Sequence, residues 1–475
     1  MRDRDVAPLG GRVDPAIPRR AVERTSAPGA QVPHISLQDA LEESGSAMRL
    51  LWKPGAAPCA VEGVKSEYVG WREEQAAWSQ GVALSDLSHH LSNLFIKGPD
   101  ATRLLAAVSA NDYKAFAVGQ AKLFVPVTAD GHLVTDGTLM RDGVDSYVLS
   151  GVPAARSWVR YHAQQRGDDV SFVLDPDSAL RGGADRLLFR HRIQGPRAPE
   201  LIERAFGGPL PKMRFFHSAA VTLAGRSFRA FRHGMAGQTG YEFVGHWEDG
   251  APVKDALLSA GKPVGLVQVG GLAYATHGIE SGWIPTPTPG IYTAPGLEGY
   301  RRFLSARSYE AVRPLHGSFF SECIEDYYVS PHELGYGKSL AFNHEFIGRG
   351  ALERSMDRVK RTKVTLVFDA DEVRDVFGAN PGYLLSYGRY RVDADDALAG
   401  VTFYSAWIDP AGTILSLALI ERRYSAPGTK VTVAWGEHPG PGAPWGIELR
   451  FARLRATVHA APCSEFARTH YRRNA

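Results

Sequence analysis

Residues 231–245 read FRHGMAGQTGYEFVG, an apolar strand, a glycine-rich turn and a second strand that carries one acid, Glu242. Gly234, Gly237 and Gly240 allow the backbone to turn sharply and to approach a ligand closely. A carboxylate in an apolar strand needs a partner if it is buried, because an unpaired buried charge is costly. The stretch therefore predicts a hairpin that holds Glu242 beside bare backbone. The alternative is an ordinary tight turn with Glu242 solvated on an outer face.

The hairpin belongs to a unit that occurs twice in the chain. Residues 94–108 (LFIKGPDATRLLAAV) and 189–206 (FRHRIQGPRAPELIERAF) both read as a strand, a Gly-Pro turn and a helix, with Gly98 and Gly195 standing 97 positions apart. Each copy continues into further strands and a second helix. Two such units predict two similar α+β halves that face each other across a pseudo-symmetric seam, where ligands are commonly held.

The 475 residues are enough for about three domains. Residues 1–34 lack periodicity and predict a flexible tail, and 35–180 and 181–362 cover the first and second α+β halves. From residue 363 onward, strands alternate with turns, so 363–475 predict a C-terminal β-barrel domain. The expected fold class is α+β, with two similar α/β halves forming the core beside a terminal barrel.

Composition excludes several classes of protein. The net charge is only +3 and the basic residues are dispersed, which argues against nucleic-acid binding. The three cysteines lie far apart without metal-ligand spacing, so we expect a reducing compartment and no disulfide or metal site. No apolar run approaches the ~20 residues of a membrane span, so we expect a soluble, cytoplasmic protein. Walker A, HExxH and GxSxG motifs are all absent from the sequence.

Five collinear motifs resemble the glycine-cleavage T-protein (aminomethyltransferase) family, from about Trp71 to the end of the chain. They are ALSDLSHHLSNLFIKGPDA (83–101), GQAKLFVPVTADGHLVTDG (119–137), IQGPRA (193–198), GQTGYE (237–242), and ELGYG with FNHEFIGRGAL (333–337 and 342–352). The resemblance implies three domains in a clover arrangement around a tetrahydrofolate site.

Two further stretches resemble one branch of that family more closely. Residues 271–285 (GLAYATHGIESGWIP) and 324–337 (IEDYYVSPHELGYG) are similar to tetrahydrofolate-dependent aryl O-demethylases of the vanillate and syringate type. This resemblance implies an enzyme that transfers the methyl group of a methoxylated aromatic compound to N5 of tetrahydrofolate. The products are a phenol and 5-methyltetrahydrofolate.

The resemblance also implies roles for individual residues. Tyr274 matches the catalytic tyrosine, His90 faces the aromatic substrate, and four residues match folate-side positions: Gln194, Glu242, Trp283 and Asp136. A tyrosine, with an ordinary pKa of about 10, suits a phenolate leaving group because it can donate a proton late in the step. A carboxylate at 242 can accept hydrogen bonds from the amine and ring N–H of a pterin.

Each assignment has a simpler alternative. Tyr274 and Trp283 are also consistent with core aromatics, and Asp136 with a carboxylate that only satisfies a neighbouring backbone amide. His89 and His90 side by side are more typical of packing than of a metal pair, so we expect no metal.

The chain departs from the demethylase pattern at one position. Vanillate-type demethylases have Gly-Arg-Ala-Pro after a strand, and the arginine suits a substrate carboxylate; here the sequence is Gly151-Val152-Pro153-Ala154. A carboxylate buried against Val152 would have no partner. The substrate therefore meets another cation, carries its acid elsewhere or lacks an acid. The alternatives for function are a folate-dependent enzyme with a non-aromatic methyl donor and a folate-binding protein without methyl transfer.

Overall fold

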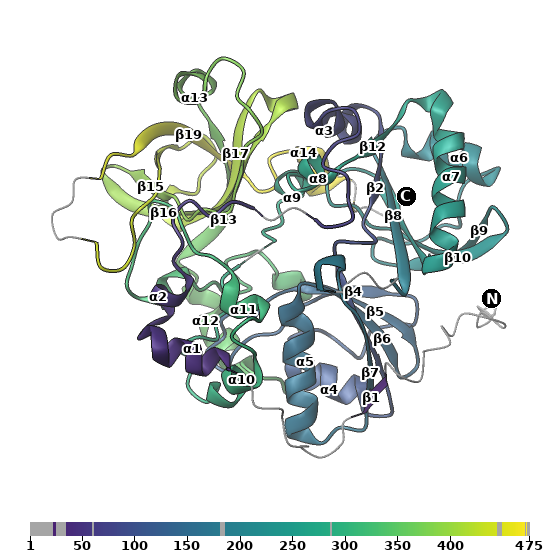
Figure 1. The fold of residues 1–475 in the computed structure, drawn as a ribbon, viewed down its shortest axis with the longest axis horizontal. Helices are drawn as coiled ribbons and strands as arrows, with labels where there is room; N and C mark the ends of the chain where they lie inside the picture. The colour runs from purple at the N-terminus through teal and green to yellow at the C-terminus, as the bar shows by residue number, and fades with distance from the viewer. Residues whose placement is uncertain are drawn as a thin grey trace.

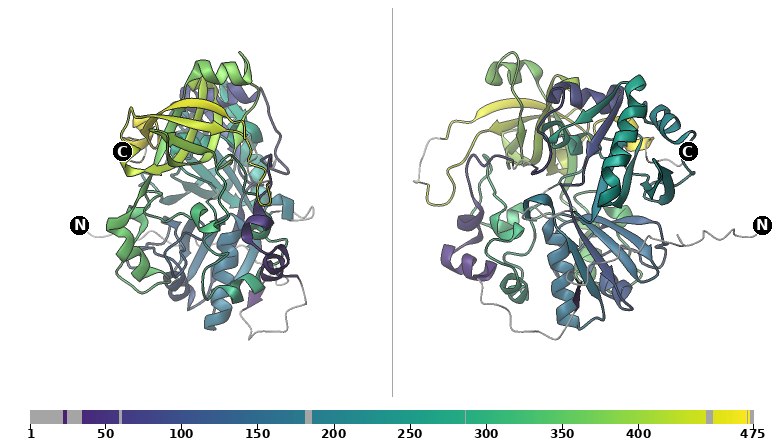
Figure 2. Two further views of the ribbon diagram at one scale, coloured as in Figure 1. Left: turned by 90° about the vertical axis from the view of Figure 1, so that its left-hand side faces the viewer. Right: turned by 45° about the vertical axis from the view of Figure 1, so that its right-hand side comes forward.

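The structure is a computed structural model that describes residues 22–24, 35–58, 61–180, 186–285, 287–443, 449–470 and 472. The chain forms three lobes around a common centre, two built on six-stranded sheets and one on a barrel (Figure 1). The barrel and the second sheet lie side by side above the first sheet, as the rotated views also show (Figure 2). The predicted three-lobed α+β arrangement is confirmed.

The first sheet has the strand order β1-β7-β3-β6-β5-β4, and α4 and α5 pack together beside it. Its elements are β1 (Val22–Arg24), β3 (Ser92–Lys97), α4 (Ala101–Val108), β4 (Ala121–Phe124), β5 (Gly137–Gly143), β6 (Ser146–Gly151), α5 (Pro153–Arg166) and β7 (Ser171–Asp175). Trp158 of α5 and Tyr147 of β6 are among the largest fully buried side chains of this lobe.

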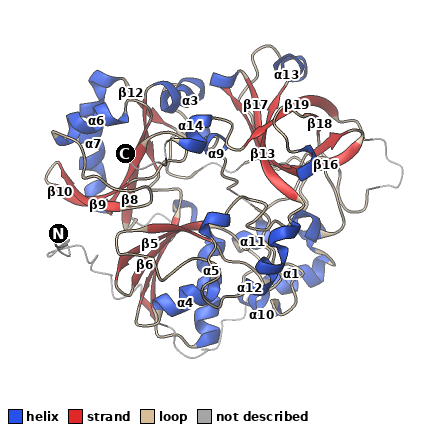
Figure 3. Cartoon of the chain, turned by 180° about the vertical axis from the view of Figure 1, so that it is seen from behind, coloured by secondary structure: helices blue, strands red, loops and turns tan. Residues whose placement is uncertain are grey.

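The second sheet has the order β12-β2-β8-β11-β10-β9, with α6 and α7 packed together beside it (Figure 3). Its elements are β2 (Val82–Asp86), β8 (Leu188–Gln194), α6 (Ala198–Phe206), β9 (Ser218–Leu223), β10 (Arg226–Phe231), β11 (Gly240–His246), α7 (Gly250–Gly261) and β12 (Leu266–Val269).

The two strand orders correspond position by position, which confirms the predicted duplication. β3, β6, β5 and β4 of the first sheet match β8, β11, β10 and β9 of the second. The two Gly-Pro turns match as well. Gly98 and Gly195 have φ values of 152° and 134°, and a Cβ atom on either would lie 2.4 Å from a backbone oxygen. Both positions therefore require glycine for the same reason, a close approach of the neighbouring strand.

The lobes do not follow the expected residue ranges in three places. β2 lies within 35–180 but pairs with β8 and β12 of the second sheet, because its side chains Val82 and Leu84 pack into the core of that lobe. Residues 22–24 of the expected tail form β1, which pairs with β7. Residues 291–328, placed in the second half, return to the first lobe and contribute Tyr292, Tyr300 and others to its core.

The barrel closes through the pairing of β16 with β17, which joins the two ends of the series β16-β15-β18-β19-β13-β17. Its elements are β13 (Arg361–Phe368), α13 (Ala370–Phe377), β14 (Leu385–Ser386), β15 (Arg391–Ala394), β16 (Ala397–Ile408), β17 (Thr413–Glu421), β18 (Lys430–Trp435) and β19 (Ala452–Ala460). Strands β16 and β17 are buried along almost their whole length, because one face fills the barrel and the other packs against the remaining lobes.

The remaining helices are short. They are α1 (Leu37–Ser44), α2 (Ala47–Leu51), α3 (Trp71–Gln80), α8 (Gly271–Tyr274), α9 (His277–Ser281), α10 (Glu298–Phe303), α11 (Tyr309–Val312), α12 (Arg349–Ser355) and α14 (Glu465–Thr469). Four of them (α1, α2, α10 and α11) pack into the core of the first lobe. In the part of the chain that the structure describes, no helix combines the length and the apolar character that a membrane crossing requires.

Candidate active site

The β10–β11 hairpin buries its acid. β10 ends at Phe231, β11 begins at Gly240, and Glu242 lies opposite Phe231 on one side and Arg192 of β8 on the other. The side chain of Glu242 is 1% exposed. The predicted hairpin is confirmed, and the alternative of a solvated Glu242 is wrong.

Three basic side chains surround the Glu242 carboxylate. Arg190 donates to Oε2 at 3.0 Å, Arg192 donates to Oε1 through Nε at 3.0 Å and also through Nη2, and His233 Nδ1 lies 2.8 Å from Oε1. Burial raises the pKa of Glu242, but the charges of Arg192, His233 and Arg190 outweigh burial and hold the pKa well below its usual range. Glu242 is therefore a fixed anion. A bidentate hydrogen bond to a ligand requires one of these donors to move away.

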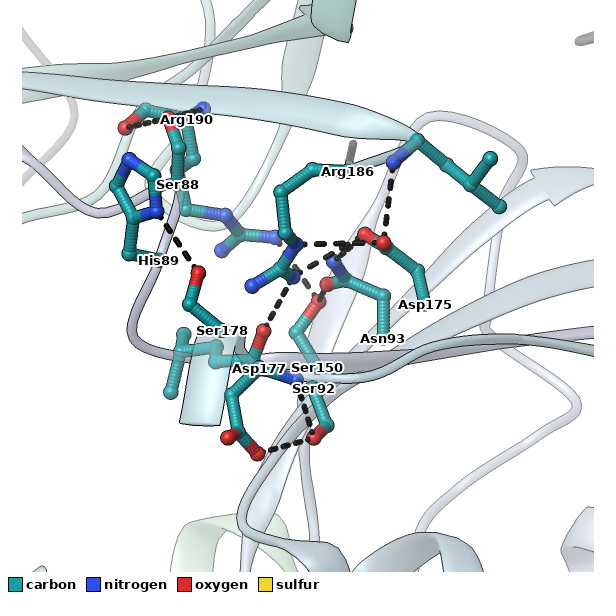
Figure 4. A network of polar contacts seen from close by, with 12 residues as sticks. Ser88, His89, Ser92, Asn93, Ser150, Asp175, Asp177, Ser178, Arg186 and Arg190 are labelled. Carbon is teal, nitrogen blue, oxygen red and sulfur yellow. Dashed lines mark hydrogen bonds and ion pairs between the residues drawn. The ribbon is translucent and has the colours of Figure 1, made fainter. Parts of the chain in front are cut away.

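A buried chain of hydrogen bonds crosses the seam between the two sheets, and Figure 4 shows it from Arg190 onward. Its members, in order, are Glu242, Arg190, Ser150, Asn93, Asp175 and Arg186. Arg190 donates to Ser150 Oγ at 2.9 Å, which joins β8 of the second sheet to β6 of the first. The two halves of the site are thereby held in one relative position, since buried polar groups are costly to leave unpaired.

The same network holds the segment that carries His90. His89 Nδ1 lies 2.8 Å from Ser178 Oγ, and Ser92 donates to Asp177 at 2.9 Å (Figure 4). His90 lies between these anchored neighbours. Burial and the charge of Arg192 lower the pKa of His90 to about 4, so its imidazole is neutral at pH 7.

Asp136 precedes β5 and is 4% exposed. Trp283 Nε1 donates to its Oδ2 at 3.0 Å and the hydroxyl of Tyr336 donates to the same oxygen at 2.6 Å. No described residue hydrogen-bonds Oδ1. Burial raises the pKa of Asp136 to about 6, and the two hydrogen bonds act in the opposite direction. The contact with Trp283 joins two residues that the sequence assigned to one site.

Tyr274 ends α8 and lies between two histidine rings. The ring of His90 meets it edge-on at 4.9 Å between centroids, and the ring of His277 stacks on it at 4.3 Å. Burial raises the pKa of Tyr274 to about 12. The hydroxyl of Tyr274 has no hydrogen-bond partner among the described residues, so it can donate to a ligand.

A small cavity of about 230 Å³ lies beside Tyr274. Its wall includes His277, Arg192 and Gln194. Gln194 uses part of its amide within the protein, donating to Gln238 O at 3.0 Å and accepting from Met235 N at 3.4 Å. The buried Nε2 atom of His277 has no partner among the described residues. The cavity therefore presents both donors and acceptors.

A larger cavity of about 850 Å³ lies between the two sheets, and Arg190 and Ser150 are part of its wall. Arg190, Arg192 and Gln194 occupy alternate positions of β8 and so share one face of the sheet. The two cavities therefore lie at successive positions along that face.

Val152 follows β6 and precedes α5. The last residue of β6, Gly151, pairs with Ser92 at the start of β3 and with Gly137 at the start of β5. Val152 therefore lies at the same end of these strands as His90 and Asp136, and its side chain supplies no charge there.

The structure adds residues that the sequence interpretation did not single out. Arg190, Arg192, His277 and Tyr336 all contact one of the assigned residues. Arg190 and Arg192 had a signal, since two arginines occupy alternate positions of a predicted strand and so share one of its faces. His277 and Tyr336 had none, because their roles depend on contacts between distant segments. The described residues contain no group of three His, Cys, Asp or Glu side chains placed to hold a metal.

Comparison with known proteins places the chain in a family. The GCVT N-terminal domain family matches residues 59–287. A syringate O-demethylase of Sphingobium sp. (strain NBRC 103272 / SYK-6) is 36% identical, over 92% of this chain and 97% of that protein. A sesamin methylene transferase of Sinomonas sp. (strain No.22) is 29% identical over 80% of this chain and 87% of its own length.

The fold has a solved counterpart. The glycine cleavage system aminomethyltransferase T from Bartonella henselae superposes with a TM-score of 0.59 at 16% identity, covering 90% of this chain and 97% of that one. With a relative more than a third identical along nearly its whole length, the chain belongs to the glycine-cleavage T-protein (aminomethyltransferase) family.

Proposed function

We propose that the chain is a methyltransferase that removes the methyl group of a methoxylated aromatic compound and transfers it to N5 of tetrahydrofolate, which yields a phenol and 5-methyltetrahydrofolate. One observation carries the proposal most directly: the hydroxyl of Tyr274 lies uncommitted between His90 and His277, beside a cavity lined by Gln194. The match along 92% of the chain to a protein named as a syringate O-demethylase supports the same reaction.

The donor set on the folate side fits a reduced pterin, which has both amide and amine edges. Gln194 retains one N–H and part of its carbonyl, and Asp136 retains Oδ1, so both can bond a ligand. Trp283 offers an indole ring next to Asp136. Glu242 fits differently, since both of its oxygens already accept hydrogen bonds; we infer that it acts mainly by fixing Arg192 and Arg190, each of which lines a cavity. Tetrahydrofolate supplies the nucleophilic N5 when it is bound.

Tyr274 acts in this proposal as a hydrogen-bond donor to the ether oxygen. Its pKa of about 12 lies two units above that of an ordinary phenol, so complete proton transfer to a phenolate would cost about 3 kcal/mol. A hydrogen bond that strengthens as negative charge develops on the oxygen avoids that cost. His90 is neutral and positions the Tyr274 ring by its edge contact. Because Tyr274 keeps its proton at neutral pH, the donor is available throughout the working range.

The proposal includes a small-molecule substrate, no contact with nucleic acid or membrane, and a cytoplasmic location. Cys323 and Cys463 both carry free thiols, which suits a reducing compartment.

The proposal is tested by incubating the purified protein with tetrahydrofolate under nitrogen and a panel of methoxybenzoates and methoxyphenols that includes syringate. Phenol products and 5-methyltetrahydrofolate are quantified by liquid chromatography. We expect equal amounts of the two products, and none when tetrahydrofolate is omitted. If the protein binds tetrahydrofolate but forms no phenol from any of the compounds, the proposal is contradicted. The chain would then be a folate-binding protein without methyl transfer.

A further inference from the structure

Arg313 follows α11 and is held on two tyrosine rings. Its guanidinium carbon lies 5.7 Å from the ring centroid of Tyr309 on the same helix and 5.1 Å from that of Tyr387 in the barrel lobe. Stacking on aromatic faces fixes a guanidinium without using its N–H groups. Figure 1 shows α11 towards the middle of the molecule, between the first lobe and the barrel.

The N–H groups of Arg313 are not used by any residue that the structure describes. Among the residues that the structure describes, no side chain or carbonyl hydrogen-bonds or ion-pairs with the Arg313 guanidinium, although the residue is only partly exposed. A cation that is removed from much of its water usually has an anion beside it. Arg313 is therefore prepared for an anion that the described part of the chain does not supply.

A second guanidinium strengthens the positive field. Arg389 of the barrel lobe is 3% exposed, and burial together with the charge of Arg313 lowers the pKa of Arg389 to about 9. Arg389 donates to the carbonyls of Tyr387 and Phe403 at 2.7 and 3.3 Å and to Thr288 Oγ1 at 3.4 Å, so most of its N–H groups already have partners within the protein. It contributes charge to the Arg313 region while Arg313 supplies the N–H groups.

One of the two tyrosines that hold Arg313, Tyr387, is linked by direct contacts to the segment that carries Tyr274. Burial raises the pKa of Tyr309, and the charge of Asp136 acts in the same direction. Tyr387 contributes in the same way to the raised pKa of Tyr274. Tyr387 also stacks on Tyr404 at 5.4 Å, and the hydroxyl of Tyr404 donates to the carbonyl of Ala275, next to Tyr274. Arg313 is thus connected through Tyr387 and Tyr404 to the backbone next to Tyr274.

We propose that Arg313 binds the carboxylate of the aromatic substrate, so that the enzyme is specific for methoxybenzoates although Val152 stands where a cation is expected. This inference rests on the proposed function. A guanidinium matches a carboxylate with two parallel hydrogen bonds, which fixes the plane of the benzoate as well as its position. Arg156, one helical turn after Val152, is already bonded to Ser92 Oγ at 3.2 Å and is the less suitable cation.

The test compares an acid with its neutral counterpart in wild type and in Arg313→Gln. The substrates are syringate and 2,6-dimethoxyphenol, which differ only in the carboxylate. We expect kcat/KM for syringate to fall about 100-fold, mainly through KM, because charged hydrogen bonds to the carboxylate are lost. The value for 2,6-dimethoxyphenol should change less than about threefold. Arg313→Lys should recover part of the loss, since lysine retains the positive charge but lacks the two parallel N–H donors of a guanidinium.

Binding of syringate without tetrahydrofolate, measured by titration calorimetry, gives a readout that needs no turnover. We expect Kd to rise with Arg313→Gln and to stay constant with the matched control Arg423→Gln, whose guanidinium lies 4.7 Å from the ring centroid of Tyr424 on the barrel surface. An equal loss for the acid and the neutral compound, or an unchanged Kd for syringate, would overturn the inference. If syringate binds through Arg313 but is never demethylated, the proposed function fails and the binding inference survives.

Discussion

The two buried carboxylates of the site, Asp136 on the first lobe and Glu242 on the second, have opposite surroundings. Asp136 receives hydrogen bonds from two neutral donors, Trp283 and Tyr336, and its pKa is raised to about 6. Glu242 is surrounded by Arg190, Arg192 and His233, and its pKa is held well below the usual range. Burial is nearly the same for both residues.

The difference shows how a duplicated framework can serve two purposes. On the second lobe the charge is permanent, and it orders the cations at the cavity. On the first lobe the carboxyl group exchanges its proton near neutral pH, so it can accept a hydrogen bond from a ligand in one state and donate one in the other. Neighbouring donors, rather than burial, decide between these two behaviours.

The largest effect is expected for Tyr274, whose pKa responds to the charged groups around Glu242. Tyr274→Phe should lower kcat by about 10²–10⁴-fold, the usual range for loss of a positioned acid or donor. Its pKa responds to Arg192 and Glu242, and the hydroxyl is bonded by no described residue, so the folded structure should not change. Single-turnover kinetics and tetrahydrofolate binding by calorimetry check this. Unchanged turnover would indicate a methyl donor whose leaving group needs no donor.

Glu242→Gln removes the permanent charge and should lower the free energy of unfolding by about 3–5 kcal/mol at pH 7, because two buried guanidinium groups lose their anion. Since the pKa of Glu242 is lowered in the folded state, its stabilisation is present above its ordinary pKa and is lost as the pH falls. Urea unfolding at several pH values measures the difference, which should shrink below about pH 4.5.

Glu310→Gln is the matched control for Glu242→Gln. Glu310 is also fully buried, but burial raises its pKa, so a neutral replacement should cost much less. Equal losses for the two variants would show that Glu242 is not held as an anion by its arginines.

Asp136→Asn should stabilise the protein above pH 6 by about 2–3 kcal/mol. A carboxyl group whose folded pKa is raised from about 4 to about 6 contributes stability at low pH, and that contribution is lost as the pH rises from 4 to 6. The wild type and Asp136→Asn should therefore be equally stable near pH 4 and differ by a constant amount above pH 6. Urea unfolding from pH 4 to 8 measures this, and parallel curves would contradict the raised pKa.

The smallest effect is expected for Tyr336→Phe, which removes one of the two donors to Asp136. The lost hydrogen bond to a charged group is worth about 1.5 kcal/mol, so the pKa of Asp136 should rise by about one further unit. The pH at which stability reaches its plateau should move from about 6 towards 7. The same series of unfolding measurements tests this. If the plateau does not move, the hydrogen bond from Trp283 alone lowers the pKa of Asp136.

Local patterns in the sequence predicted the framework. The repeat around Gly98 and Gly195 predicted two similar halves, because a close backbone approach requires glycine at the same position of both copies. Alternating strands after residue 363 predicted the barrel, and the turn before Gly240 predicted the hairpin. The contacts between Trp283 and Asp136 and between His90 and Tyr274 join residues that the family resemblance grouped together.

Partners from distant segments could not be predicted from the sequence. Arg192 as the counter-ion of Glu242 depends on the register between β8 and β11, and Tyr336 as a donor to Asp136 depends on how the third lobe docks. The placement of β2 was missed for a similar reason, since an apolar strand of five residues has the same composition in either sheet. Arg313 carries no sequence signal, because its proposed role depends on having no hydrogen-bond or ion-pair partner among the described residues.

β2 ties the two halves of the chain together. It precedes the first α+β unit, yet it separates β8 from β12 and fills in the second sheet the place that β7 fills in the first. A polypeptide that begins after residue 180 would expose an unpaired edge of β8, and one that ends there would leave β2 without its neighbours. Neither half is therefore a self-sufficient folding unit, and splitting the gene at the seam should give two insoluble fragments that regain structure only when they are produced together.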